Sequence, residues 1–136
     1  DVFRFVQECA RVLKPGGFLL VQDHVLPDDE LAARYIDAFE SLRDPSHNRA
    51  YAEYEWRGLF LDAGLTVERT ETISKTHTLV TWAERQGCPP EIIARLQLLL
   101  VQAPDTATGA MRPQHIGTPE ATFDNNHLLI LGKKPA

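Results

Sequence analysis

The spacing of apolar residues predicts a helix at the start of the chain. Apolar side chains recur every three to four residues, which is typical of a helix with one buried face; they are Val2, Phe5, Val6, Cys9, Ala10 and Leu13. Asp1 is suited to cap this helix. The sequence Lys14-Pro15-Gly16-Gly17 then ends it, because Pro15 disfavours a helical Lys14 and Pro15-Gly16 fits the centre of a type II turn.

An unbroken apolar segment, Phe18 to Val21, follows this turn. Apolar residues without alternation favour a strand that is buried on both faces, as the central strands of a parallel sheet are. Gln22, Asp23 and His24 come directly after the segment. Because ligands of open α/β sheets bind beyond the carboxyl ends of the strands, we expect Asp23 and His24 to face a binding cleft.

The middle of the chain predicts two helices and a strand. Pro27 to Glu30 provides the cap and acidic first turn of a helix, and turn-forming residues at 43–48 end it. A second helix is expected over 50–63, with Gly64 in a left-handed conformation at its end. The segment 65–74 is rich in Thr, Val and Ile and is expected to form a strand near a sheet edge.

The C-terminal part predicts two more helices, a long loop and a strand. Residues 79–86 and 89–103 carry helical apolar patterns. Residues 104–121 are rich in Thr, Gly and Pro, so we expect an irregular loop that either covers a substrate or lacks order. The last buried strand is expected over 122–132.

Composition and charge exclude several classes of protein. The 136 residues are 43% hydrophobic, which is ordinary for a globular chain and too high for a disordered one. A net charge of -5 without a basic stripe makes nucleic acid an unexpected partner. No apolar run is long enough to span a bilayer, so no membrane partner is expected. Two cysteines argue against a disulfide framework, and we expect a cytoplasmic location.

Two motifs are the most distinctive patterns in the chain. Arg11-Val12-Leu13-Lys14-Pro15-Gly16-Gly17 stands directly before the apolar strand, and Asp62-Ala63-Gly64-Leu65 joins a helix to the next strand. They resemble the surroundings of the fifth and sixth strands of class I S-adenosylmethionine-dependent methyltransferases, most of all the ubiquinone- and menaquinone-biosynthesis branch (type 11). The last strand resembles the antiparallel seventh strand, which lies between those two. Residues 43–47 and Trp56 are similar to a subgroup of bacterial members.

The resemblance implies an α/β fold, namely the C-terminal part of a Rossmann-like class I methyltransferase sheet with helical insertions at 27–50 and 75–121. The family's glycine-rich cofactor loop and its acidic ribose-binding residue have no counterpart here. We therefore expect a single partial domain, the C-terminal half of a methyltransferase, which fits a start at Asp1 without methionine. S-adenosylmethionine is then expected to bind the intact parent but not this chain alone, which we expect to be inactive.

The strand at 18–23 would lack one neighbour in such a half-domain. An open strand edge with apolar side chains favours pairing with another chain. We expect a homo-oligomer or an exchange of elements through this edge. The methyl acceptor is expected to be a small molecule, and the sequence leaves its nucleophilic atom open.

The candidate substrate-binding residues are spread along the chain: Asp23, His24, Arg43, His47, Trp56 and His115. His24 is a candidate base or substrate anchor, and the alternative is a solvated loop residue. His47 could close over a substrate, unless it only belongs to a turn held by Asp44 and Ser46. Arg43 could bind an acidic group or remain solvated.

Trp56 could line a cleft, although its helical spacing with Leu59 and Phe60 is more typical of core packing. His115 lies in the long loop. The histidines lack metal-ligand spacing, so we expect no metal site, and no catalytic residue can be named. Two other functions stay open: a non-catalytic dimerisation module that uses half of the fold, and a ligand-binding domain.

Overall fold

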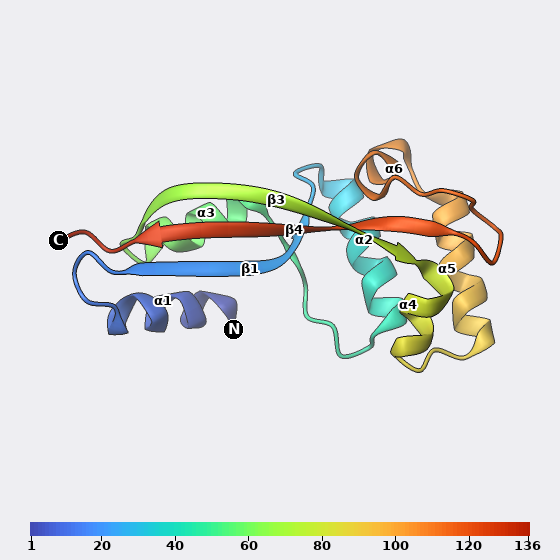
Figure 1. Ribbon diagram of the computed structural model, residues 1–136, viewed down its shortest axis with the longest axis horizontal. Coiled ribbons are helices and arrows are strands. Elements are labelled where there is room, and N and C mark those ends of the chain that lie inside the picture. Colours follow the sequence, from blue (N-terminus) through green and yellow to red (C-terminus); the bar gives the residue numbers. More distant parts are fainter. The chain divides into compact units, whose positions relative to one another are not determined.

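The computed structural model describes residues 1–136 and divides them into two compact units (Figure 1). Unit 1 consists of Asp1–Val25, Tyr51–Ile73 and His127–Ala136, and unit 2 consists of Leu26–Ala50 and Ser74–Asn126. The segments 27–50 and 75–121, which the sequence analysis treats as separate insertions, both belong to unit 2.

Helices and strands are mixed along the chain, as expected for an α/β fold. The elements are α1 (Val2–Val12), β1 (Phe18–Leu26), α2 (Glu30–Arg43), β2 (Tyr51–Ala52), α3 (Glu53–Asp62), β3 (Thr66–Thr78), α4 (Leu79–Arg85), α5 (Pro90–Gln102), α6 (Asp105–Met111) and β4 (Thr122–Lys133). The sheet has the order β2-β1-β4-β3, and β4 runs antiparallel to β1. The last strand therefore lies between the two earlier long strands, as the resemblance implied. None of the helices has the length and apolar character needed to cross a membrane.

In unit 1, α1 and α3 pack on one face of the sheet. The buried side chains of this core come from both helices, from β1 and β4, and from the residue before β3; they are Val6, Ala10, Val25, Trp56, Phe60, Leu65, Leu128 and Ile130. Asp1 caps α1 by accepting a hydrogen bond from the amide of Arg4. Gly16 and Gly64 have φ angles of +80° and +82°, which confirms the turn and the left-handed helix end predicted there.

The expectation that Phe18 to Val21 is buried on both faces is wrong. Leu19 and Val21 pack against the core of unit 1, whereas Phe18 and Leu20 remain 55% and 61% exposed. The alternation arises because both helices of unit 1 cover the same face of the sheet, so side chains on the opposite face have no layer above them.

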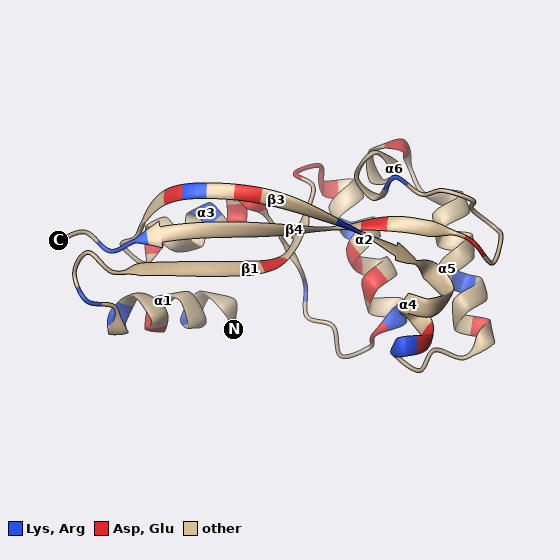
Figure 2. Ribbon diagram, viewed as in Figure 1, with Lys and Arg blue, Asp and Glu red and all other residues tan.

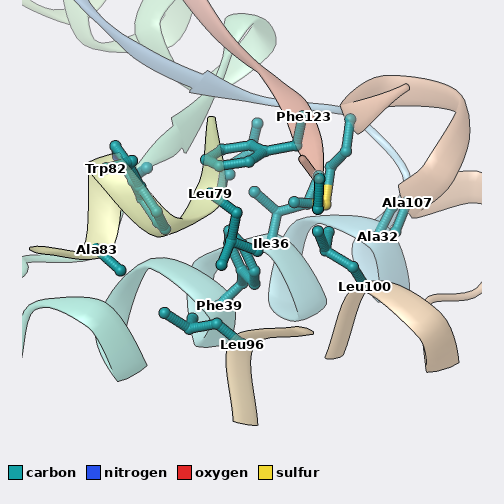
Figure 3. Packing of buried hydrophobic residues seen from close by; sticks show 14 residues of the cluster. Ala32, Ile36, Phe39, Leu79, Trp82, Ala83, Leu96, Leu100, Ala107 and Phe123 are labelled. Atoms are coloured by element: carbon teal, nitrogen blue, oxygen red, sulfur yellow. The ribbon is translucent and has the colours of Figure 1, made fainter. Parts of the chain in front are cut away.

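Unit 2 has its own apolar core, to which α2, α4, α5 and α6 all contribute (Figure 3). Three aromatic rings form its centre. Phe39 stacks on Trp82 with ring centroids 5.2 Å apart, and Phe123 meets Trp82 edge-on at 4.7 Å. Asp29 caps α2 by accepting a hydrogen bond from the amide of Ala32 at 2.9 Å. The unit therefore has an aromatic centre that is packed among its helices.

The expectation of an irregular loop over 104–121 is wrong in its first half, which forms α6. Thr and Gly are weak helix formers, but Ala107 and Met111 are buried in the core of unit 2, and this packing outweighs local preference. The remainder turns through the left-handed residues Arg112 and His115, and Gln114 then pairs with Thr122.

Candidate functional site

Two buried polar side chains, Glu40 on α2 and Asn125 on β4, form a pair inside unit 2. Their exposed fractions are 7% and 8%. The amide nitrogen Nδ2 of Asn125 donates a hydrogen bond to Oε1 of Glu40 at 2.8 Å. Burying polar groups among apolar side chains costs free energy unless they are bonded. We call these two residues the polar pair, and their burial marks them as the centre of a candidate site.

The position of Glu40 follows from the helical repeat of α2. It lies one turn after Ile36 and next to Phe39, both of which are buried in the core of unit 2. Burial raises the pKa of Glu40 above its ordinary value, because a desolvated carboxylate is disfavoured. The positive charges of His47 and Arg43 and the hydrogen bond from Asn125 oppose this rise. Glu40 therefore holds a proton more readily than a solvated glutamate.

The carbonyl oxygen of Asn125 is buried and has no hydrogen-bond partner. A buried acceptor without a donor costs about 1–3 kcal/mol. The neighbouring residue on the strand, Asn126, differs in this respect. Its amide nitrogen donates to the carbonyl of Ala110 at 3.0 Å, and its side-chain oxygen accepts from the hydroxyl of Ser74 at 2.6 Å. The unpaired oxygen is thus a property of Asn125 and not of the strand.

Asp37 on α2 and His47 on the loop after α2 also form a hydrogen-bonded contact. The ring nitrogen Nε2 of His47 is 2.9 Å from Oδ1 of Asp37, which also accepts a hydrogen bond from the amide of Ala50 at 3.0 Å. Acidic residues occur at several places along α2 (Figure 2). Since Asp37 and Glu40 are three residues apart, they project from neighbouring positions on the helix surface.

The loop that carries His47 has the predicted turn structure. Asp44 accepts hydrogen bonds from the amide of Ser46 at 3.0 Å and from its hydroxyl at 2.6 Å. These bonds lower the pKa of Asp44 below its ordinary value. The predicted turn is therefore present, and His47 at its end contacts Asp37.

The side chain of Arg43 packs against the aromatic core of unit 2. Its guanidinium carbon lies 4.2 Å from the centre of the Trp82 ring, and its Nε donates to the Trp82 carbonyl at 2.9 Å. His77 lies near the same indole, with ring centroids 6.4 Å apart. Burial, followed by the positive charges of Arg43, Arg85 and Lys75, lowers the pKa of His77. Arg43 thus contributes charge to the site while its side chain packs on Trp82.

The other sequence-predicted residues are not part of this cluster. Asp23 and His24 belong to unit 1, where the Asp23 carboxylate accepts from the amide of His24 at 2.8 Å and the His24 ring lies 5.9 Å from that of His127. Trp56 is 2% exposed in the core of unit 1, as its helical spacing suggested. His115 is exposed in a left-handed turn of unit 2.

Sequence reasoning missed Asp37, Glu40 and Asn125. Glu40 carried a usable signal, because it falls on the stripe through Ala32 and Ile36 where an apolar residue is expected. Asn125 lies two positions after the buried Phe123, so the two-residue period of a strand places it on the same, inward side. Asp37 had no such signal.

The potential metal ligands of the chain are scattered, and two of its glycines are needed for close packing. No three His, Cys, Asp or Glu side chains gather in a way that could hold a metal ion. The two glycines that closely approach other atoms face the chain itself: a Cβ at Gly17 would lie 2.9 Å from the Lys14 carbonyl oxygen, and one at Gly132 would lie 2.6 Å from Phe60. Both glycines are therefore required by the packing of the chain itself.

Comparisons with known proteins find relatives among methyltransferases. No family model matches the sequence. The uncharacterized protein YafE of Escherichia coli K12 is 33% identical over 98 residues, which are 72% of this chain and 47% of YafE. The uncharacterized methyltransferase YcgJ of Bacillus subtilis 168 is 33% identical over 110 residues, which are 78% of this chain and 44% of YcgJ. The chain thus spans about half the length of the curated relatives it matches.

Solved structures give the same result for the fold. BH2331 of Bacillus halodurans C-125, provisionally assigned as a methyltransferase, matches 98% of this chain and 63% of its own at a TM-score of 0.91 and 26% identity. YcgJ of Bacillus subtilis matches 100% of this chain and 58% of its own at a TM-score of 0.91 and 28% identity. A protein of Galdieria sulphuraria, provisionally assigned as a sarcosine dimethylglycine methyltransferase, shares the fold at a TM-score of 0.51 and 19% identity, over 99% of this chain and 48% of its own. The expected α/β sheet is confirmed by the first two matches.

Proposed function

We propose that this chain forms the acceptor-binding portion of an S-adenosylmethionine-dependent enzyme that acts on a small molecule. The premise is that the chain belongs by sequence and fold to the class I methyltransferases. The agreement with two solved structures over nearly the whole chain supports the reaction class. The curated relatives are about twice as long as the part that this chain matches, and we assign the activity to a whole protein of that kind.

The polar pair in unit 2 is the observation that carries the acceptor-binding role. Methyl transfer needs few catalytic side chains, because alignment of the two reactants supplies most of the rate enhancement. Small-molecule sites combine apolar walls with a few fixed polar groups. Unit 2 offers this combination, with Glu40 and Asn125 held beside the aromatic rings of Phe39 and Phe123.

S-adenosylmethionine supplies the methyl group in this family when it is bound. The glycine-rich loop and the acidic residue that hold it in the family have no counterpart in this sequence. We therefore propose that residues 1–136 alone neither bind it nor transfer its methyl group. The role of these residues is to hold and orient the acceptor.

A chimera tests the proposal. The matched portion of Bacillus subtilis YcgJ is replaced by residues 1–136, and methyl-labelled S-adenosylmethionine is added with a cell extract separated by ultrafiltration into small molecules and macromolecules. We expect the chimera to label the small-molecule fraction, whereas residues 1–136 alone leave it unlabelled. Calorimetry with S-adenosylmethionine accompanies both, and we expect heat of binding for the chimera only.

Two results would overturn the proposal. Binding of S-adenosylmethionine by residues 1–136 alone contradicts the assignment of this chain to the acceptor side. A chimera that binds S-adenosylmethionine but labels only macromolecules, or nothing, contradicts a small-molecule acceptor. Unmodified YcgJ is the control for the labelling reaction.

A non-catalytic role in dimerisation is favoured by one separate observation in unit 1. A depression of about 240 Å³ on the uncovered face of the sheet is lined by Leu20, Leu129 and Leu131 together with Arg69 and Glu71. Exposed apolar surface of this kind marks contact sites. The association of this face with a second copy is tested below through Leu20.

A further inference from the structure

We propose that two copies of this chain associate through the uncovered faces of their unit 1 sheets, and that reciprocal ion pairs between Arg69 and Glu71 fix the geometry of this dimer. The inference deepens the dimerisation role proposed above and rests on it. It adds the symmetry of the contact and the charged side chains that select the partner. Methyl transfer is not involved.

Apolar side chains of two neighbouring strands cover the centre of the uncovered face. Leu20 of β1 lies opposite Leu131 of β4 in the register of the sheet. Both leucines line the depression together with Leu129, which is two positions before Leu131 and therefore on the same side of β4. Phe18 continues this surface along β1 and is 55% exposed. Two sheets that pack face to face bury side chains of this kind between them, so the face is suited to a second sheet.

Two side chains of opposite charge, Arg69 and Glu71 of β3, line the same depression. Within one copy they form a loose ion pair, in which Nη2 of Arg69 is 3.6 Å from Oε2 of Glu71. Their side chains are 76% and 60% exposed, so both keep hydrogen-bonding capacity for a further partner. A lining of one sign would attract a ligand or a membrane surface of the opposite charge. This lining is neutral as a whole, and the partner that fits it carries the same two charges in reverse order.

A second copy presents this reverse order through a two-fold axis. In such a contact the same surface is used by both copies, so a residue that touches a second residue of the partner is matched by the reciprocal contact. An axis that runs across the strands between Arg69 and Glu71 places the arginine of each copy opposite the glutamate of the other. Because β4 lies beside β3, the same axis brings the leucines of the two depressions together. One symmetry operation therefore satisfies the apolar and the charged parts of the face.

Analytical ultracentrifugation of the 136-residue chain tests this arrangement with two charge reversals. Arg69→Glu makes the charged part of the face negative in both copies, and Glu71→Arg makes it positive. We expect each variant to self-associate at least about tenfold more weakly than the wild type, because like charges then meet across the contact. An equimolar mixture of the two variants should recover the association of the wild type. Mixing cannot restore an ion pair within one copy, so the recovery reports only on contact between copies.

The ion pair of Glu8 and Arg11 on α1 provides the matched control. It is also an exposed pair of glutamate and arginine, and α1 packs on the opposite, covered face of the sheet. Glu8→Arg and Arg11→Glu repeat the two changes of net charge away from the proposed contact. We expect each of them to associate like the wild type, and their mixture to show no gain. Circular dichroism verifies that all four variants are folded.

Three results would overturn the inference. They are a wild type that stays monomeric at every concentration, a mixture of Arg69→Glu and Glu71→Arg that associates no better than either variant alone, and an equal loss of association in the α1 variants. If Leu20→Lys dissociates the dimer but the mixture shows no recovery, the reciprocal pairing is wrong although the face remains a contact site. The failure of the inference is thereby distinguished from the failure of the role on which it rests.

Discussion

Replacement of Gly132 by alanine provides a sharp test of the packing between β4 and α3 in unit 1. An added Cβ would lie 2.6 Å from Cδ2 and 2.7 Å from Cε2 of Phe60, and 3.4 Å from a methyl group of Leu65. Carbon atoms prefer separations of about 3.5–4.0 Å, so the ring of Phe60 must move by about 1 Å. Phe60 is fully buried and has no solvent to move into.

The expected cost is that of overpacking a filled core, about 1–3 kcal/mol of unfolding free energy. Gly58 supplies the matched control, because it lies in α3 close to Phe60 but a Cβ there would meet nothing within 4 Å. Gly58→Ala is expected to stabilise the chain by about 0.5–1 kcal/mol, since alanine is the better helix former. The two alanine variants should therefore shift stability in opposite directions.

Urea unfolding followed by circular dichroism measures both variants. A third variant, Gly132→Ala with Phe60→Leu, removes the ring carbon atoms that clash, so its loss of stability should be smaller than the sum of the two single losses. A Gly132→Ala chain as stable as the wild type, or a double variant that is strictly additive, would refute the close approach of β4 to α3.

Three further predictions follow from the described contacts. Glu40→Gln should be more stable than the wild type at neutral pH. The reason is that the raised pKa of Glu40 makes wild-type stability fall as the pH rises from the ordinary pKa of 4.5 towards the folded pKa. Urea titrations at several pH values measure the difference in stability, and a difference that does not depend on pH contradicts the prediction. Because the pKa of His77 is lowered in the folded chain, the unfolded chain takes up a proton first as the pH falls. Stability should therefore decrease as the pH drops below 6.5 towards the folded pKa. Nuclear magnetic resonance titration of the His77 ring measures its pKa, and a value of 6.5 or above contradicts the prediction. The wild-type chain should self-associate as its concentration rises, and Leu20→Lys should weaken the association, because Leu20 lies on the uncovered apolar face. Analytical sedimentation measures the association. A wild type that is monomeric at every concentration tested argues against this face as a contact site.

Much of the fold could be predicted because its signals are local. The cap at Asp1, the turn at Gly16 and the helix end at Gly64 each depend on neighbouring residues, and all three are present as expected. The order of the last strand required the family resemblance, because pairing between β1 and β4 joins residues far apart in sequence. The helix α6 could not be predicted locally, since Ala107 and Met111 stabilise it only through the core of unit 2.

The candidate site was predicted only in part. Arg43 and His47 were named from a distinctive turn, and the structure places them around Glu40. Asp37 and Asn125 were missed because the sequence does not show which element packs against a polar residue on a helix or a strand.

By itself, the sequence determined the cap of α1, the turn at Gly16 and the end of α3, because caps, turns and apolar spacing act within a few residues. Only the tertiary structure decided which side of β1 lacks a covering layer and which polar groups are buried together. Burial and hydrogen bonding depend on residues that are distant in the chain, as the 85 positions between Glu40 and Asn125 illustrate.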